Sequence, residues 1–209
     1  MVEGRRVRAY IGLGANVGDA RRTLDAAVGA LGVLPGASLR GVSRLYATRP
    51  VGVEDQPDFL NAVVALDAPL GPDPASGALA LQLALKGLEG AFGRRTTRRW
   101  GPRELDLDLL VFGRHRIHVE RPPAGRSRDP ARPVARWLDV PHPSAAERLF
   151  VLAPLADLAP CLVPPGWGSS VESRRLGRVA VVGATAVRPV ARWVAGAGWR
   201  SDDADQASR

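Results

Sequence analysis

Residues 104–112 read ELDLDLLVF, with leucines and acids at alternating positions. Successive side chains of a β-strand point to opposite faces, so Leu105, Leu107 and Leu109 share one face while the acids share the other. A helix, with a period of 3.6 residues, would not separate the two kinds of side chain in this way. The stretch therefore predicts a strand with one buried face and one carboxylate face, about midway along the chain.

The segments before this strand alternate between strand and helix patterns. Two of them place apolar residues at helical spacing, the first after Asp19, a plausible N-cap, and the second before Gly93, where a C-terminal cap is expected. The expected order is a strand at 7–13, a helix with the stripe Leu24, Val28 and Leu31, an extended stretch at 38–48, a strand at 59–67, a helix with the stripe Leu81, Leu85, Leu88 and Phe92, and the strand at 104–112. This βαββαβ order predicts an α+β fold with a ferredoxin-like core. Its antiparallel sheet is expected to carry the helices on one face and the ligand site on the other.

The length of 209 residues allows one domain with a short appendage. Residues 1–175 are interpreted as that domain. Residues 114–136 lack periodicity and are rich in Arg, Pro and Gly, which predicts an irregular insertion. Residues 176–209 are expected to form a C-terminal tail that is partly disordered, above all in its last ten residues.

Arginine dominates the charge, because 28 of the 29 basic residues are arginine and the formal net charge is +8. Arginine binds phosphate oxygens through a planar fork of donors, so a phosphate-bearing partner is one interpretation, and a compositional bias is the other. Cys161 is the only cysteine, which excludes an intramolecular disulfide and fits a reducing cytoplasm. No stretch has the ~20 apolar residues of a membrane span, so we expect a cytoplasmic protein without a membrane partner.

The acidic face of the strand at 104–112 suits a metal ion. Asp106 and Asp108 are two residues apart, which places their Cα atoms roughly 6–7 Å apart on one face. Mg²⁺ needs only one or two protein carboxylates when water and phosphate oxygens complete its shell. An isolated acidic pair is usually a solvated strand face, but here a group of arginines precedes it and adds phosphate-binding donors. These are Arg94, Arg95, Arg98, Arg99 and Arg103.

Other nucleotide and nucleic-acid sites are disfavoured. Gly12, Gly14 and Gly18 do not fit the dinucleotide fingerprint, which requires glycine at position 17, and the single lysine, Lys86, lies in an expected helix rather than in a Walker loop. The acidic pair would repel a polyanion, and aromatic residues make up only 5% of the chain, few for a base-stacking surface. We therefore expect no nucleic-acid partner.

Several longer stretches resemble one family, the 6-hydroxymethyl-7,8-dihydropterin pyrophosphokinases of folate biosynthesis. The resemblance is carried by AYIGLGANVGD, YATRPVGVEDQPDFLNAVVAL, LEGAFGR, RWGPRELDLDLLVFG and VPHPSAAERLFVLAPLADLAP, within about residues 7–165. DQPDFLNA and RWGPR followed by LDLD are highly specific to the family. The resemblance implies a ferredoxin-like fold with mobile loops, and the transfer of pyrophosphate from ATP to the hydroxymethyl group of 6-hydroxymethyl-7,8-dihydropterin with release of AMP.

The resemblance also implies roles for individual residues. Asp106 and Asp108 resemble the ligands of two Mg²⁺ ions that bridge the ATP phosphates, and Arg94 and Arg103 resemble catalytic arginines. The full set of implied contacts is Glu89, Arg94, Trp100, Arg103, His142 and Arg148 for ATP, and Thr48, Val51, Phe59, Asn61, Trp100 and Phe150 for the pterin. Within the second group, the phenylalanines are expected to sandwich the pterin ring and the asparagine to read its polar edge.

The chain departs from the family pattern in a few places. Lys86 stands where glutamine is familiar, Arg49 replaces a small apolar residue, and the segment 93–100 is one residue shorter than in some members, which leaves the pairing of individual arginines with phosphates open. The expected partners are ATP and the pterin, and the expected state is a monomer. Two rival hypotheses are a different nucleotide-dependent transferase on the same fold and an inactive nucleotide- or pterin-binding regulator.

Overall fold

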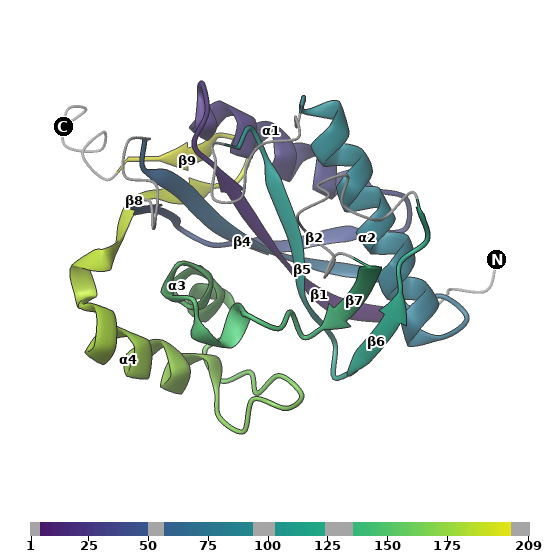
Figure 1. Cartoon of the computed structure of the whole chain (residues 1–209). Coiled ribbons are helices and arrows are strands. Elements are labelled where there is room, and N and C mark those ends of the chain that lie inside the picture. Colours follow the sequence, from purple (N-terminus) through teal and green to yellow (C-terminus); the bar gives the residue numbers. More distant parts are fainter. Residues whose placement is uncertain (1–4, 50–56, 94–102, 124–135, 202–209) are drawn as a thin grey trace.

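One large antiparallel sheet organises the chain (Figure 1). The computed structural model describes residues 5–49, 57–93, 103–123 and 136–201, and within these ranges the sheet has seven strands in the order β5-β1-β4-β3-β8-β9, with β2 also paired to β4. The elements up to β5 are β1 (Arg6–Ala15), α1 (Ala20–Gly32), β2 (Ser38–Val42), β3 (Leu45–Thr48), β4 (Phe59–Pro69), α2 (Pro74–Ala91) and β5 (Asp106–Phe112). The α+β fold class is confirmed, and the predicted βαββαβ order holds except that the extended stretch at 38–48 forms two strands, β2 and β3.

Local sequence sets where the first two helices begin and end. The Asp19 side chain accepts a hydrogen bond from the backbone N–H of Arg22 at 3.0 Å, and Asp73 accepts one from Ser76 at 2.9 Å, so each carboxylate pairs an N–H of the first helical turn. Beyond the end of α2, Gly93 adopts a φ of +80°, which glycine tolerates because it lacks a Cβ. Among the helices of these described ranges, none is long and apolar enough to cross a membrane.

Helices cover both faces of the sheet. On one face, the predicted apolar stripes of α1 and α2 pack into the main core. On the opposite face, Val63, Ala65 and Leu110 pack against α3 (Leu149–Leu158), which in turn lies against α4 (Val171–Val182). Figure 1 shows α1 and α2 on one side of the sheet and α3 and α4 on the other. The two predicted helices lie on one face, as expected, but α3 and α4 cover part of the opposite face, which was not expected, because this second apolar surface also requires cover.

Part of the expected irregular insertion at 114–136 is regular. β6 (Ile117–Glu120) pairs with β7 (Trp137–Val140) in a separate two-stranded antiparallel sheet. Ile117 and Val140 lie opposite each other and are both buried. Burial of these apolar residues explains why the short hairpin forms, so the prediction of an irregular excursion was wrong for residues 117–120. Residues 124–135 lie outside the described residues.

The expected C-terminal tail is also structured as far as residue 201. The boundary predicted at residue 175 falls inside α4, which is followed by η4 (Ala184–Ala186), β8 (Val187–Val194) and β9 (Gly198–Arg200). β8 joins the large sheet by pairing with β3. Trp199 is 1% exposed and its indole Nε1 donates to the Ser43 carbonyl oxygen at 2.9 Å. This buried anchor makes the segment part of the domain, and the remaining residues of the expected tail lie outside the described residues.

Candidate active site

β5 presents the two predicted metal ligands on one face. Leu107 and Leu109 are buried in the main core, whereas Asp106 and Asp108 alternate with them and are only half-buried. The strand predicted from ELDLDLLVF is therefore confirmed, with its leucines inward. Both carboxylates point from the face opposite α1 and α2.

Glycines of β1 form the surface beside these carboxylates. Gly14 pairs with Asp106 on one side and with Asn61 of β4 on the other, and Gly12 pairs with Asp108. Neighbouring strands are about 4.8 Å apart, so Asp106 and Asn61 lie about 10 Å apart across Gly14 on one face. A Cβ at Gly14 would lie 3.4 Å from Asn61 Oδ1. The glycines therefore leave no side chain standing between the carboxylate and the amide.

Three of the implied pterin contacts come together where β3 ends and β4 begins. Thr48 pairs with Phe59 in the strand register. Asn61 Nδ2 donates to Thr48 Oγ1 at 3.0 Å and to the Phe59 carbonyl oxygen at 3.4 Å. Asn61 is 7% exposed, and these bonds hold its amide in one orientation with Oδ1 toward Gly14. Val51 lies outside the described residues.

A buried asparagine fixes Arg103. The Arg103 backbone N–H donates to Asn16 Oδ1 at 2.8 Å, the Asn16 N–H donates to the Arg103 carbonyl at 3.0 Å, and Asn16 Nδ2 donates to the Pro57 carbonyl at 3.3 Å. The Arg103 side chain forms an ion pair with Asp106. A predicted phosphate-binding group and a predicted metal ligand therefore meet. Sequence reasoning assigned no role to Asn16, although it lies within the family-like stretch AYIGLGANVGD.

Glu89 ties α2 to β5. Its carboxylate, 3% exposed, accepts hydrogen bonds from the Leu107 N–H and from Lys86 Nζ, both at 2.7 Å. Lys86 Nζ also donates to the Leu107 carbonyl oxygen at 3.2 Å. The pair thus holds both backbone polar groups of the residue between the two aspartates. Glu89, implied as an ATP contact, lies next to the site with its carboxylate directed at the strand.

His142 approaches β5 from the segment before α3. Its N–H donates to the Leu110 carbonyl oxygen at 2.9 Å. The Ser144 N–H donates to His142 Nδ1 at 3.3 Å, so Nδ1 is the acceptor and the proton of the neutral ring is on Nε2. Burial lowers the pKa of His142, Asp108 opposes this shift and Arg148 reinforces it. The site therefore keeps a neutral imidazole with one N–H donor.

Arg148 and Phe150 flank the start of α3. The Arg148 guanidinium carbon lies 5.8 Å from the centre of the Phe150 ring. The half-buried ring packs at the edge of two apolar clusters around α3. The fold thus holds an implied ATP contact against an implied wall of the pterin pocket. Arg94 and Trp100, the other implied residues, lie outside the described residues.

Arg121 lies in the segment predicted to be an irregular insertion, and no role was predicted for it from the sequence. Its N–H donates to the Arg136 carbonyl oxygen at 2.7 Å, directly after the β6–β7 ladder. Burial lowers the pKa of Arg121, while the carboxylates of Asp108, Asp139 and Glu89 oppose the shift. The guanidinium therefore lies within electrostatic reach of the acidic face of β5. No local signal marks it, because only the folded hairpin brings it there.

The donor set of the site is sparse. Within the described ranges, no group of three or more His, Cys, Asp and Glu side chains could hold a metal ion. Asp106 and Asp108 offer two half-buried carboxylates, which suit a hard cation such as Mg²⁺ when water and phosphate oxygens supply the other ligands. The arrangement can bind such an ion together with a phosphate ligand rather than in a protein-only cage.

Comparisons with known proteins point to one family. A family model described as 7,8-dihydro-6-hydroxymethylpterin-pyrophosphokinase (HPPK) matches residues 10–160. The 2-amino-4-hydroxy-6-hydroxymethyldihydropteridine pyrophosphokinase of Pseudomonas aeruginosa is 42% identical over 158 residues, which are 76% of this chain and 84% of that protein. The protein of the same name from Bacillus subtilis is 41% identical over 150 residues, 72% of this chain and 77% of that protein.

Solved structures share the fold at much lower identity. Wild-type HPPK-DHPS of Plasmodium falciparum matches 96% of this chain with a TM-score of 0.68 and 14% identity, and an HPPK-DHPS in complex with substrates matches 94% with a TM-score of 0.66 and 14% identity. This chain spans about half the length of those chains, 51% and 50%, so they show the fold alone. The family model and the relatives above 40% identity decide the assignment. The chain belongs to the 7,8-dihydro-6-hydroxymethylpterin-pyrophosphokinase family.

Proposed function

We propose that this chain transfers pyrophosphate from ATP to the hydroxymethyl group of 6-hydroxymethyl-7,8-dihydropterin, with release of AMP, in folate biosynthesis. The observation that carries the proposal is the placement of Asp106, Gly14 and Asn61 side by side on three adjacent strands. A metal–phosphate site beside a pterin site, with no side chain between them, suits a reaction that joins two bound substrates. Family membership supports the same reaction.

The reaction needs alignment and charge neutralisation more than a general base. The hydroxymethyl oxygen forms a bond to the β-phosphorus of ATP, the bond from that phosphorus to the oxygen of the α-phosphate breaks, AMP leaves and the hydroxyl proton is released. Arg103, fixed through its backbone by Asn16, lies at the carboxylate edge where the phosphates would bind. Its planar guanidinium can bind two phosphate oxygens at once.

Asp106 and Asp108 would hold Mg²⁺, and the family resemblance leads us to expect two ions. The two half-buried carboxylates fit a metal that retains water and phosphate ligands. When bound, Mg²⁺ would neutralise and orient the phosphate oxygens. Chelation with EDTA should abolish AMP formation and added Mg²⁺ should restore it, whereas full activity in EDTA would contradict the metal role.

The other implied residues divide between the two substrates. Phe59 and Phe150 offer aromatic faces for a flat heterocycle, and Asn61, oriented by Thr48, offers an amide to its polar edge. For ATP, the donors are the Nε2–H of neutral His142 together with the guanidinium groups of Arg148 and Arg121. The contacts implied for Arg94, Trp100 and Val51, and a direct ATP contact for Glu89, stay predictions, as do the monomeric state and the cytoplasmic location.

Product identification tests the proposal. The purified chain is incubated with ATP, Mg²⁺ and 6-hydroxymethyl-7,8-dihydropterin, and nucleotides are separated by anion-exchange chromatography. We expect AMP in a one-to-one ratio with the pterin diphosphate, and no AMP when the pterin is omitted. ADP as the product would favour a different transferase on the same fold. Binding of both substrates without any product would favour an inactive regulator.

Order of binding gives a second test. Because a bound nucleotide should organise the arginines around Arg103 and Asp106, we expect the affinity for the pterin to rise when a non-hydrolysable ATP analogue and Mg²⁺ are present. Isothermal titration calorimetry with and without the analogue measures this coupling. Equal pterin affinity in the two titrations would contradict it.

A further inference from the structure

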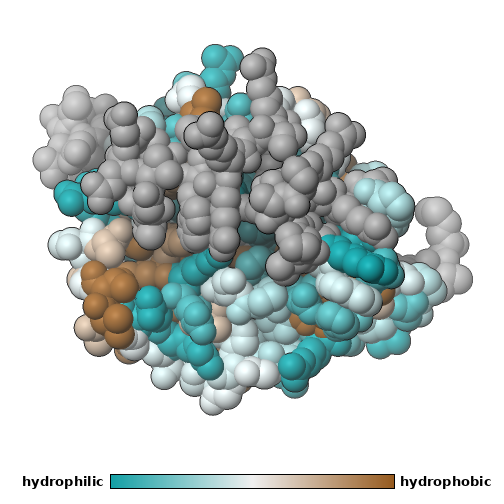
Figure 2. Space-filling model, in the orientation of Figure 1, coloured by the Kyte–Doolittle hydropathy of each residue, from teal (hydrophilic) through white to brown (hydrophobic). Residues whose placement is uncertain are grey.

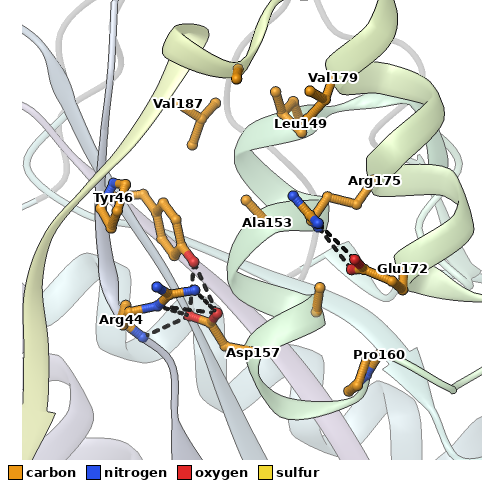
Figure 3. A pocket seen from close by; sticks show the side chains of 13 residues that line it. Arg44, Tyr46, Leu149, Ala153, Asp157, Pro160, Glu172, Arg175, Val179 and Val187 are labelled. Carbon is orange, nitrogen blue, oxygen red and sulfur yellow. Dashed lines mark hydrogen bonds and ion pairs between the residues drawn. The ribbon is translucent and has the colours of Figure 1, made fainter.

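A cavity of about 510 Å³ lies between α3, α4, β3 and β8 (Figure 3). Leu149 and Ala153 of α3 form one apolar wall, and Val179 of α4 and Val187 of β8 form the other. Arg148 and Phe150 flank the wall residue Leu149 in sequence. They belong to the proposed ATP and pterin sites and do not line the cavity. Its volume is within the range of small-molecule pockets.

Every carboxylate oxygen in the cavity wall already has donors. Asp157 accepts from Arg44 Nη2 at 2.6 Å, from the Arg44 backbone N–H at 3.0 Å and from the Tyr46 hydroxyl at 2.9 and 3.0 Å. Glu172 accepts from Arg175 Nε at 2.8 Å and from Arg175 Nη2 at 2.6 Å. Burial raises the pKa of Tyr46, and Asp157 raises it further, so the hydroxyl remains a donor to that carboxylate. The cavity therefore has no free acceptor among these acids.

Two arginines retain unused donors. In Arg44 and in Arg175, Nε and Nη2 form the ion pair, and the Nη1 group of each makes no hydrogen bond to a described residue. A guanidinium carries five N–H donors, two of them on Nη1. Figure 3 shows the Arg175 side chain reaching from α4 over the cavity, toward Ala153. The pKa of Arg175 is raised mainly by its hydrogen bond to Glu172, with smaller contributions from Tyr46 and Asp157 across the cavity.

A space with apolar walls, occupied acceptors and unused guanidinium donors is complementary to a ligand that has an apolar body and an anionic acceptor. We propose that this cavity binds a small organic carboxylate with an aromatic or branched apolar body, with its carboxylate on Arg175 and Arg44 and its body between Leu149 and Val187. None of the residues assigned to ATP or to the pterin lines the cavity, and the proposal does not rest on the proposed function. About half of its lining comes from residues 172–189, beyond the part of the chain that matches the family model.

An exposed apolar surface lies next to this cavity. Val181 and Val182, 72% and 43% exposed, follow the lining residue Val179 and precede the lining residue Ala184. Figure 2 shows hydrophobic residues gathered on this face over the end of α4. The end of the helix that supplies Arg175 and Val179 is therefore apolar, which suits a ligand with an apolar body.

Calorimetric titration with benzoate tests the proposal on the full-length chain. We expect saturable binding of one benzoate, at least ~10-fold weaker binding of neutral benzamide, and a loss of at least ~10-fold in benzoate affinity in Arg175→Gln, because each comparison removes a charge-assisted hydrogen bond. The matched control is Arg22→Gln, which removes the same charge from an exposed position on α1. This control should bind benzoate like the unaltered chain.

A second variant guards against a folding defect in the first. Ala156→Leu keeps every donor but places extra volume in the lining of the cavity, so it should weaken benzoate binding while far-ultraviolet circular dichroism stays unchanged. Saturating ATP with Mg²⁺ should leave benzoate affinity unchanged, since no residue assigned to ATP lines the cavity. The proposal is overturned by any of three results: no saturable binding, equal affinity in Arg175→Gln, or displacement of benzoate by ATP.

Discussion

The two faces of β1, β4 and β5 carry different residues on the same three strands. On the side of α1 and α2, the inward positions are all apolar. They include Ile11, Leu13, Val64, Leu66, Leu107 and Leu109. At the same levels on the other side stand Gly12, Gly14, Asn61, Asp106 and Asp108. Because side chains along a strand alternate between the two faces, residues that are adjacent in sequence lie on opposite faces of the sheet. The effect of a substitution here therefore depends on the face of its residue more than on its distance along the chain from the site.

Asp108→Asn should give the largest effect and only on activity. Loss of one carboxylate removes a proposed metal ligand, so we expect the rate of AMP formation to fall roughly 100- to 1,000-fold. The side chain is half-buried and outside the main core, so the free energy of unfolding should change by less than about 1 kcal/mol. Initial rates and urea unfolding curves measure the two quantities. A variant that keeps its rate would show that the acidic face is only a solvated strand surface.

Leu107→Ala, one residue earlier, should show the opposite pattern. Leu107 is 0% exposed in the main core, so the truncation should lower the free energy of unfolding by about 3 kcal/mol. Its backbone remains held by Glu89 and Lys86, so the rate per folded molecule should stay within a few-fold of the original. The same two measurements decide the outcome. A loss of rate as large as that of Asp108→Asn would show that the two faces are not independent.

Sequence reasoning succeeded where local periodicity decides the structure. Alternation placed β5, helical spacing placed the stripes of α1 and α2, and Asp19 marked the first helix start. It failed for β8, which falls within the segment expected to be a partly disordered tail. In the sheet Pro189 lies opposite Tyr46, next to an irregularity in the register, a place where a strand accepts proline. It failed for β6 because four residues are too few to show a pattern.

Apart from Asp106 and Asp108, which strand alternation already marks, residues of the candidate site could be predicted only where they lie in family-like stretches. Asp106, Asp108 and Asn61 fall into such stretches, and the strand register then explains why they belong together. Asn16 was missed because its partner Arg103 is 87 residues away. Arg121 was missed because its surroundings exist only after the hairpin folds. Contacts between distant segments are set by tertiary packing, which local patterns do not encode.

Asn16→Ala should affect both quantities, because this side chain is buried but bonds to the site. Asn16 is 3% exposed, and its loss leaves the Arg103 N–H and the Pro57 carbonyl without these bonds, so we expect a destabilisation of about 1–3 kcal/mol. Displacement of Arg103 should also lower the rate by about 10-fold. Asn16→Asp, which keeps the acceptor for the Arg103 N–H, is the control and should retain more of the rate. If both variants lose stability but keep the rate of AMP formation, Asn16 does not position Arg103.

Substitution of Asp67 should have the smallest effect on stability and none on activity. Asp67 is a residue of the polar face to which we assign no role in the reaction. Asp67 lies on the same face as Asn61, at the far end of β4, and pairs with Arg8 at 2.6 Å and with Arg40 at 2.5 Å. Its hydrogen bond from Arg8 lowers the pKa of Asp67, burial opposes this shift and Arg40 adds to it. The two arginines are about half exposed, so solvent screens the pairs and their contribution to stability should be about 1 kcal/mol or less.

The pH dependence of unfolding separates this contribution from the others. A carboxylate with a lowered pKa stabilises the folded state fully above its ordinary value of about 3.9, and this stability is lost as the pH falls from there through the folded pKa. Asp67→Asn should therefore be less stable than the unaltered chain at pH 7, and the difference should shrink below about pH 4. It should also shrink at 1 M salt, because exposed pairs are screened.

Urea midpoints at both pH values and both salt concentrations measure this, with AMP formation at pH 7 as the control that should not change. A difference that persists at low pH would mean that packing of the side chain, and not its charge, accounts for the effect, and a loss of activity would mean that the polar face acts as one unit.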